Sequence, residues 1–252
     1  MEEDNVENEP LENQISIDGK EQKVKRKYNK NDIMLHKDNA LKRLDLSFLK
    51  HIDLKEYKKS ELLAYWINDF ANYHDNEKNF DISKSGVYKR GDIIKVNLGF
   101  NIGNELGGLH YCVIINKYDN TKNGILNVLP LSSKKNNKKY ASNTVNIGYD
   151  LYNRLNASLQ SEKNEFKAII NEIDKIRKHI PNIDDYVKVE EKYINKIEKE
   201  ISKMNYPSIV LVNQITSISK QRIYKDRIIR NISLSENSLD LIDKKISKIF
   251  LK

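Results

Sequence analysis

The alternation of polar and apolar residues predicts a small twisted β-sheet in the middle of the chain. Residues alternate from Asp92 to Leu98, and apolar runs follow from Tyr111 to Ile115 and from Ile125 to Leu131. Alternation with period two and short apolar runs between turn residues are typical of strands. The connecting loop, Gly99 to Gly108, holds four glycines around Glu105, which lets its backbone approach another group closely. We therefore expect three strands, with this loop at the mouth of a barrel.

A helical pattern precedes the sheet and begins at Asn31. The apolar residues of its first segment fall at mixed helical spacings: Ile33, Leu35, Leu41, Leu44 and Leu46. A second segment, Lys55 to Tyr73, places five apolar residues on one helix face: Leu62, Leu63, Trp66, Ile67 and Phe70. Ser60 is a candidate N-cap, although the periodicity starts earlier. We expect Trp66, the only tryptophan, to anchor this helix to the barrel rather than to stack on a base, and the polar stretch Asn72 to Gly86 to be a linker.

A second, longer helical pattern interrupts the strands from Asp150 to Met204. Apolar residues at helical spacing run from Leu151 to Ile180 and again from Tyr186 to Ile201, with a break at Pro181-Asn182. Two amphipathic helices joined by a short turn form an antiparallel hairpin, and at about 1.5 Å per residue the first would be about 40 Å long. Such a hairpin is expected to project as a spacer or coiled-coil dimerisation arm, or else to clamp nucleic acid.

One further strand and a closing helix are predicted after this hairpin. The strand is the apolar stretch SIVLVNQI, Ser208 to Ile215. Ser235 followed by Glu236 is typical of a helix start. The apolar residues of that helix are expected to face the barrel: Leu239, Leu241, Ile242, Ile246, Ile249 and Phe250.

Composition and charge indicate a class of partner. Of the 252 residues, 32% are charged and 38% hydrophobic, which favours a protein with much of its length on the surface. The formal net charge of +8 favours an anionic partner, most commonly nucleic acid, although a merely solvated basic surface is the alternative. The acidic segment Met1 to Glu12 and the basic segment Lys20 to Lys30 cannot bury enough apolar surface to order themselves. We expect a flexible tail there, whose acidic part could fold back on a basic groove.

Several kinds of chemistry and location are excluded by the sequence. The single cysteine, Cys112, rules out an internal disulfide and a cysteine-based zinc site, and its apolar strand predicts a buried structural thiol rather than a nucleophile. We find no metal-ligand spacing, phosphate-binding loop or nucleophile elbow, so no metal and no cofactor is expected. The polar N-terminus and the lack of a long apolar run predict a cytoplasmic protein with no membrane span.

The order of five short motifs carries a resemblance to a known family. They are Gly91-Asp92-Ile93, Gly103-Asn104-Glu105-Leu106-Gly107-Gly108, Val113-Ile114-Ile115, Pro130-Leu131-Ser132-Ser133 and the stretch from Gln214 to Arg222. In this order they resemble the toxins of the MazF/PemK family. The resemblance implies an SH3-like β-barrel with a C-terminal helix, a homodimer, a cognate antitoxin protein as partner, and metal-independent cleavage of single-stranded RNA.

Together, pattern and resemblance predict an α+β fold with a divided barrel. Residues 87–149 and 205–252 would form the MazF/PemK-like barrel, and 150–204 the inserted antiparallel helical hairpin. Residues 31–80 would form an N-terminal helical region, and 1–30 a disordered acidic and basic tail.

The implied reaction uses the RNA itself, because the ribose 2′-OH attacks the adjacent phosphate and gives a 2′,3′-cyclic phosphate and a 5′-OH end. The protein must supply a base, an acid and donors for the charged phosphorane. The resemblance assigns His110 to a position where the family commonly has Arg, and Ser132 to that of the catalytic Thr or Ser. Asn213 stands where some relatives have an acid. An imidazole, with a pKa of about 6.5, suits acid or base work, whereas Asn213 cannot take a proton. His110 and Ser132 could also be ordinary hydrogen-bonded strand residues.

Substrate binding is expected around the same mouth. The residues assigned to it are Glu105, Gly107, Gly108, Ser133, Lys134, Gln214 and Arg222. Further loop cations could contact phosphates: Lys89, Arg90, Lys135, Lys138, Lys139 and Lys220. Three tyrosines could stack on unpaired bases: Tyr111, Tyr118 and Tyr140. The alternative hypothesis is a catalytically inactive SH3-like module that binds RNA or protein and assembles through the hairpin.

Overall fold

The computed structural model describes residues 28–135, 140, 142–176, 182–225, 227–229 and 231–251. The predicted flexible tail falls almost wholly outside them, as do Lys138, Lys139 and Pro181. The chain divides into two compact units, Met1–Tyr57 and Lys58–Lys252. In the first unit, helix α1 (Lys30–Asp53) begins after Asn29, whose side chain accepts the N–H of Asn31. Every residue of α1 is described and none is buried.

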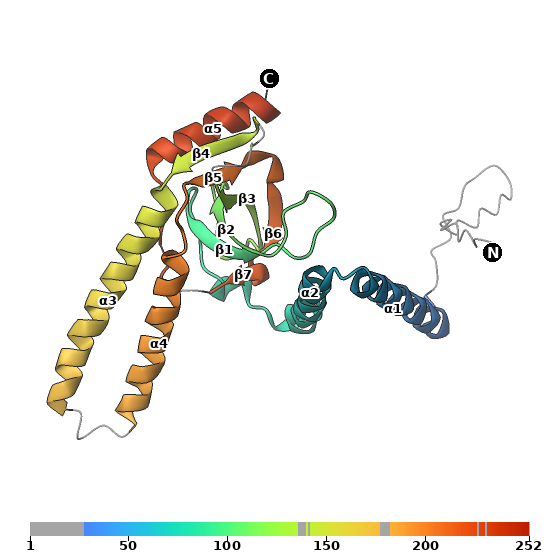
Figure 1. Cartoon of the computed structure of the whole chain (residues 1–252), viewed down its shortest axis with the longest axis horizontal. Helices are drawn as coiled ribbons and strands as arrows, with labels where there is room; N and C mark the ends of the chain where they lie inside the picture. Colours follow the sequence, from blue (N-terminus) through green and yellow to red (C-terminus); the bar gives the residue numbers. More distant parts are fainter. Residues whose placement is uncertain are drawn as a thin grey trace. The chain divides into compact units, whose positions relative to one another are not determined.

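The second unit is built on one antiparallel β-sheet (Figure 1). Within the described residues it has seven strands: β1 (Ile93–Asn97), β2 (Leu109–Ile114), β3 (Ile125–Ser133), β4 (Thr144–Gly148), β5 (Ser208–Leu211), β6 (Thr216–Ser219) and β7 (Ile223–Tyr224). Their order is β4-β5-β3-β2-β1-β7, and β6 also pairs with β3. With the five α-helices of the described chain, this confirms the predicted α+β class. The expected closed barrel is wrong, because the sheet ends at β4 and β7, which do not pair with each other.

Strand β3 is the centre of the sheet. Its first part pairs with β6 and its last three residues pair with β5, so strands from both sides of the helical interruption join it. Because successive side chains of a strand point to opposite faces, β3 contributes to two apolar clusters. One, here the Cys112 cluster, is formed by Ile94, Val96, Leu98, Cys112, Ile114, Leu126, Val128 and Ile218. The other, here the Leu129 cluster, includes Leu129, Leu131 and the apolar faces of the helices that follow β4.

Helices α3 (Asp150–Ile176) and α4 (Ile183–Ile201) lie side by side (Figure 1). The apolar positions that predicted them do meet, since both helices contribute to the Leu129 cluster: Leu151, Leu155, Leu159, Ile194, Ile197 and Ile201. Helix α4 is also tied to the sheet by polar contacts. The ammonium of Lys95 in β1 lies 2.7 Å from Glu200 Oε1, and Tyr111 in β2 donates its hydroxyl hydrogen to the same oxygen at 2.8 Å.

The last helix, α5 (Glu236–Phe250), starts where the sequence predicted. Ser235 is its N-cap and accepts the N–H of Ser238. Ile242 is fully buried, and Leu239 and Ile246 pack against the Leu129 cluster. Leu241, Ile249 and Phe250 are exposed, so the expectation that they face the sheet is wrong: one side of a helix can contact the sheet, and these three lie off it.

Three predicted boundaries shift in the structure. Helix α2 (Tyr57–Asn76) begins before Ser60, which is therefore a buried residue of its first turn and not its cap. The expected linker is partly ordered, because α2 runs to Asn76 and two 3₁₀ turns follow it. The apolar stretch expected to be one strand is broken after β5 by a 3₁₀ turn, Val212–Gln214. Because of this break, β5 pairs with the last residues of β3 and β6 pairs with its first residues.

Candidate functional site

The glycine-rich loop between β1 and β2 is closed by its own backbone. Gly108 donates its N–H to Gly99 O at 2.6 Å, and Leu98 donates to Gly108 O at 2.8 Å. Between these bonds the backbone is so close that a Cβ on Gly107 would lie 2.6 Å from Gly99 O. Only glycine fits this position without a shift of the loop, which explains one of the glycines the sequence marked.

Gln214 holds this loop from the other half of the sheet. Its side-chain oxygen accepts the N–H of Leu106 at 3.1 Å, and its amide nitrogen donates to Asn104 O at 3.2 Å. A cavity of about 340 Å³ lies beside this contact. It brings together four of the residues assigned from the sequence: Glu105, Asn213, Gln214 and Arg222. The remaining wall is largely formed by Leu98, Pro130, Thr216 and Ile218.

His110 and Ser132 do not line this cavity, but they continue the strand face on which it lies. The β2–β3 pairing ends with Cys112 opposite Pro130, and His110 and Ser132 lie two residues beyond this pair, on β2 and on β3. Directly opposite residues of antiparallel strands share a face, as do residues two apart. The cavity contacts Pro130 on that face. The imidazole and the hydroxyl are therefore on one side of the sheet, next to the cavity.

A hydrogen bond orients the His110 ring. Its Nδ1 lies 3.2 Å from the carbonyl oxygen of Leu131, the residue before Ser132. A carbonyl oxygen can only accept, so Nδ1 is the protonated nitrogen in this contact. In the neutral ring, Nε2 is then unprotonated and can accept a proton, as a general base must. His110 is half-buried, which fixes the ring while leaving it partly accessible.

The other residues that the sequence assigned to substrate binding do not line the cavity beside Gln214. Ser133 and Lys134 are exposed at the end of β3, where Lys134 donates its N–H to Pro207 O. Gly107 and Gly108 form the neck of the loop. Lys220 cannot contact phosphate, because its side chain is fully buried with that of Asp119, 2.8 Å away. The sequence placed it on a surface loop, where no local pattern distinguishes a buried lysine from an exposed one.

The tyrosines divide in the same way. Tyr111 is engaged by Glu200, and Tyr140 donates its hydroxyl hydrogen to Ser133 O at 2.9 Å. Tyr118 is 80% exposed, so its ring is accessible to a ligand. Cys112 is fully buried, and burial raises the pKa of its thiol to about 12, which confirms the predicted structural thiol. In the described part of the chain, no three His, Cys, Asp or Glu side chains gather as a metal site would require, and no helix is long and apolar enough to cross a membrane.

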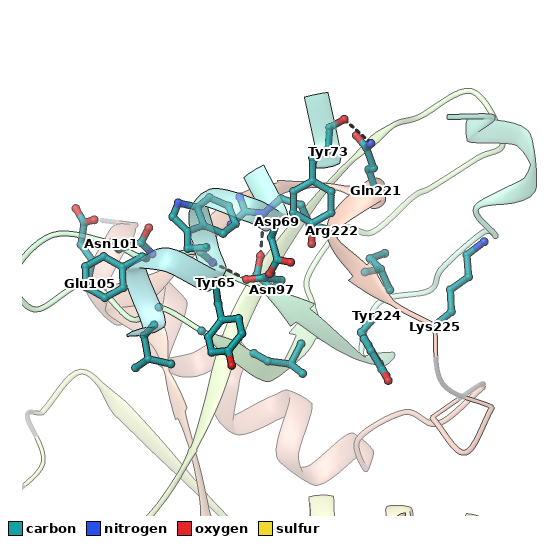
Figure 2. Close-up of a pocket in the computed structure, with 18 residues that line it drawn as sticks. Tyr65, Asp69, Tyr73, Asn97, Asn101, Glu105, Gln221, Arg222, Tyr224 and Lys225 are labelled. Atoms are coloured by element: carbon teal, nitrogen blue, oxygen red, sulfur yellow. Dashed lines mark hydrogen bonds between the residues drawn. The ribbon is translucent and has the colours of Figure 1, made fainter. Parts of the chain in front are cut away.

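Helix α2 packs against Arg222, a contact that the sequence analysis did not predict (Figure 2). The Arg222 guanidinium lies 5.4 Å from the centre of the Trp66 ring and donates through Nε to Asn97 O at 2.8 Å. Burial lowers the pKa of Arg222, although a guanidinium stays charged at neutral pH. Trp66 also fills the space next to Gly99, where a Cβ would lie 2.9 Å from its ring. This confirms the predicted anchoring role of Trp66.

Comparison with known proteins adds a family to this geometry. Residues 89–204 match the family described as PemK-like, MazF-like toxin of type II toxin-antitoxin system. No curated protein matches the chain. The matched residues include His110 and Ser132, whereas Gln214 and Arg222 lie beyond them. Because β5 and β6 pair with β3, the segment after the match completes the same sheet. Residues 89–204 are therefore similar to the PemK-like, MazF-like toxins of type II toxin-antitoxin systems, the family that the motif order had indicated.

Proposed function

We propose that this protein is a toxin endoribonuclease that cleaves single-stranded RNA through the attack of a ribose 2′-OH, without a metal ion. The family match of residues 89–204 supports the reaction class, because toxins of this family are generally endoribonucleases. The observation that supports the proposal is the contact of His110 Nδ1 with the carbonyl oxygen of Leu131, the residue before Ser132, at 3.2 Å. Strand β3, which carries Leu131 and Ser132, borders the cavity lined by Gln214 and Arg222.

In the proposed reaction, Nε2 of His110 takes the proton of the 2′-OH. The 2′ oxygen then bonds to phosphorus, the bond from phosphorus to the 5′ oxygen breaks, and the imidazolium can return its proton to the leaving oxygen. Ser132 donates a hydrogen bond to a non-bridging oxygen of the phosphorane, which carries the developing charge. The products are a 2′,3′-cyclic phosphate and a 5′-OH. A 2′-deoxy nucleotide at the cut position blocks the reaction, since the nucleophile is absent.

Substrate contacts follow from the same geometry. Arg222 and Lys134 supply positive charge for phosphates, and Ser133 lies at the end of β3 next to Ser132. Gln214 acts through the loop that it holds, and it is therefore a positioning residue. Glu105 and Asn213 line the cavity and can accept or exchange hydrogen bonds with a base. Asn213 takes no part in proton transfer, so His110 carries that role.

The test is cleavage of single-stranded RNA by the full chain in EDTA, with the RNA ends identified. We expect cyclic-phosphate ends from the wild type. His110→Ala should lower the rate about 10²–10⁴-fold, and Ser132→Ala about 10²–10³-fold. His110→Asn is the matched control for a structural role, because its amide can replace Nδ1 as donor to Leu131 O but cannot act as a base. It should be as inactive as His110→Ala.

Each other outcome changes the conclusion. Full activity of both alanine variants would overturn the site, and rescue by His110→Asn would make His110 a structural residue. RNA binding without cleavage by the wild type would favour the inactive binding module. We further propose a homodimer in the cytoplasm that is neutralised by an antitoxin protein. Sedimentation of the purified chain at the monomer mass across micromolar concentrations would refute the dimer.

A further inference from the structure

A second cavity, of about 720 Å³, lies between α2 and the sheet, on the other side of Arg222 (Figure 2). Its volume falls in the range of about 300–1,000 Å³ that is usual for small-molecule sites. Aromatic side chains from separate elements form much of its wall: Tyr65, Trp66, Tyr73, Phe100 and Tyr224. We propose that this cavity binds one unpaired base of the RNA, next to the nucleotides at which cleavage occurs. The proposal rests on RNA being the substrate.

The α2 wall is held in place by specific contacts. Asn97 in β1 donates its amide to Asp69 of α2 at 2.7 Å, and Gln221 donates its amide to Tyr73 O at 2.8 Å. Trp66 stacks with the Arg222 guanidinium and fills the space at Gly99. The cavity is therefore built by contacts between α2 and the sheet. Helix α2 precedes the residues that match the family, so the α2 wall of the cavity lies outside the matched segment.

The charges around the cavity favour a neutral occupant. The four ionised side chains that line it balance: Asp69, Glu105, Arg222 and Lys225. A phosphate would meet two carboxylates here, whereas a neutral base would meet no net charge and could donate its N–H groups to those carboxylates. Lys225 follows Tyr224 at the edge, where a flanking phosphate can lie.

The aromatic side chains favour a flat ring among neutral occupants. Tyr65 is 61% exposed and Tyr224 is 44% exposed, although both line the cavity, and they reach it from α2 and from β7 (Figure 2). Exposed aromatic faces around an unpaired base are the means by which proteins bind single-stranded nucleic acid without a fixed sequence. The chain's charge of +8 supports a nucleic acid rather than an aromatic peptide as the source of the ring.

The cavity is also placed to act on the same RNA strand as the cleavage site. Asn101, Glu105 and Arg222 line both this cavity and the smaller one beside Gln214. A strand whose phosphate is at His110 and Ser132 can therefore continue past Arg222 and insert a neighbouring base under α2. Base insertion would hold the strand beside the cleavage site, and so it would contribute to the affinity for RNA.

Trp66 provides the measurement, since it is the only tryptophan and lines the cavity. The test is a titration of the full chain with a single-stranded 2′-O-methyl oligonucleotide of mixed sequence, which the enzyme cannot cut. Tryptophan fluorescence reports binding. Tyr65→Ala should raise Kd about 5- to 150-fold, the range for loss of one stacked base. Tyr65→Phe keeps the ring and should stay within about twofold. Tyr186→Ala removes a tyrosine of α4 that is 72% exposed and lies outside the cavity, and this variant should bind like the wild type.

A second arm tests for the base itself. Nucleoside monophosphates should quench Trp66 fluorescence, and ribose 5-phosphate at the same concentration should not. An unchanged Kd for Tyr65→Ala, or equal quenching by ribose 5-phosphate, would overturn the cavity as a base site. If an aromatic peptide displaced the oligonucleotide and nucleotides had no effect, the cavity would be a binding site for a protein segment instead.

The two proposals fail separately. His110→Asn should bind the oligonucleotide with the same Tyr65 dependence while it cuts no RNA. Tyr65-dependent binding by a wild type that never cleaves would remove the nuclease and keep the base site. Cleavage by Tyr65→Ala at the wild-type rate and positions, with no change of Trp66 fluorescence on adding nucleotides, would remove the base site and keep the nuclease.

Discussion

Replacing Lys220 by methionine should destabilise the sheet unit by about 3–5 kcal/mol, the usual cost of leaving one charge of a buried pair without its partner. The side chains of Lys220 and Asp119 are both 0% exposed and lie 2.8 Å apart. The Lys220 ammonium also donates to Gly86 O at 3.0 Å and to Asn120 O at 3.3 Å. Methionine fills similar volume but removes the charge and all of these bonds. The carboxylate of Asp119 then stays buried without a cation.

Urea unfolding of the full chain at pH 7 measures this loss. With an m value of about 2 kcal/mol/M, the midpoint should fall by about 1.5–2.5 M. Lys84→Met is the matched control, because Lys84 is 83% exposed in its ion pair with Asp81, and such pairs contribute at most about 1 kcal/mol. The double variant Lys220→Met with Asp119→Asn should be more stable than Lys220→Met alone, since it removes the uncompensated charge.

The pH dependence provides an independent check. Burial by itself would raise the pKa of Asp119, but the hydrogen bonds from Lys220 and from the Tyr88 N–H outweigh it and lower that pKa. A lowered pKa stabilises the fold above the unfolded value of about 3.9, and this contribution is lost as the pH falls through the folded pKa. In Lys220→Met the burial effect dominates, so its deficit against wild type should shrink in acid. A deficit below about 1 kcal/mol at pH 7, or one that grows in acid, would refute the reasoning.

Three further predictions concern other parts of the unit. Burial alone would raise the pKa of Asp150, but hydrogen bonds from two serines at the start of α5 outweigh it and lower that pKa. Asp150→Asn should therefore cost about 1–3 kcal/mol of unfolding free energy at pH 7, and less in acid, where the wild-type carboxylate is protonated. Urea unfolding at pH 7 and in acid measures both values. Gly107→Ala should lower the free energy of unfolding by about 1–3 kcal/mol and weaken RNA binding, because the new Cβ would lie 2.6 Å from Gly99 O. An alanine variant with wild-type stability and affinity would show that the loop adapts freely. Cys112 should react with a thiol reagent only when the protein unfolds, so that labelling of the folded protein at the rate of a free thiol would contradict its raised pKa and burial.

Local pattern determined most of the secondary structure, because strand and helix periodicity and caps depend on neighbouring residues. Strands β1, β2 and β3, the helices α3 and α4 and the Ser235 cap all appear where the sequence predicted them. The burial of Cys112 followed in the same way from an apolar strand. Motif order also sufficed to recognise the family.

Contacts between distant segments were decided only by the tertiary structure. Lys220 looked like a loop cation, but its partner is about a hundred residues away, and only folding places Asp119 beside it. Contacts between distant segments also decide three other features: the open edge of the sheet, the turn between β5 and β6, and the packing of α2 against Arg222. The contact of the His110 ring with the carbonyl oxygen of Leu131 has the same origin, since it depends on how β2 packs beside β3. Periodicity reports which side of an element is buried, whereas register and packing fix what each side chain meets there.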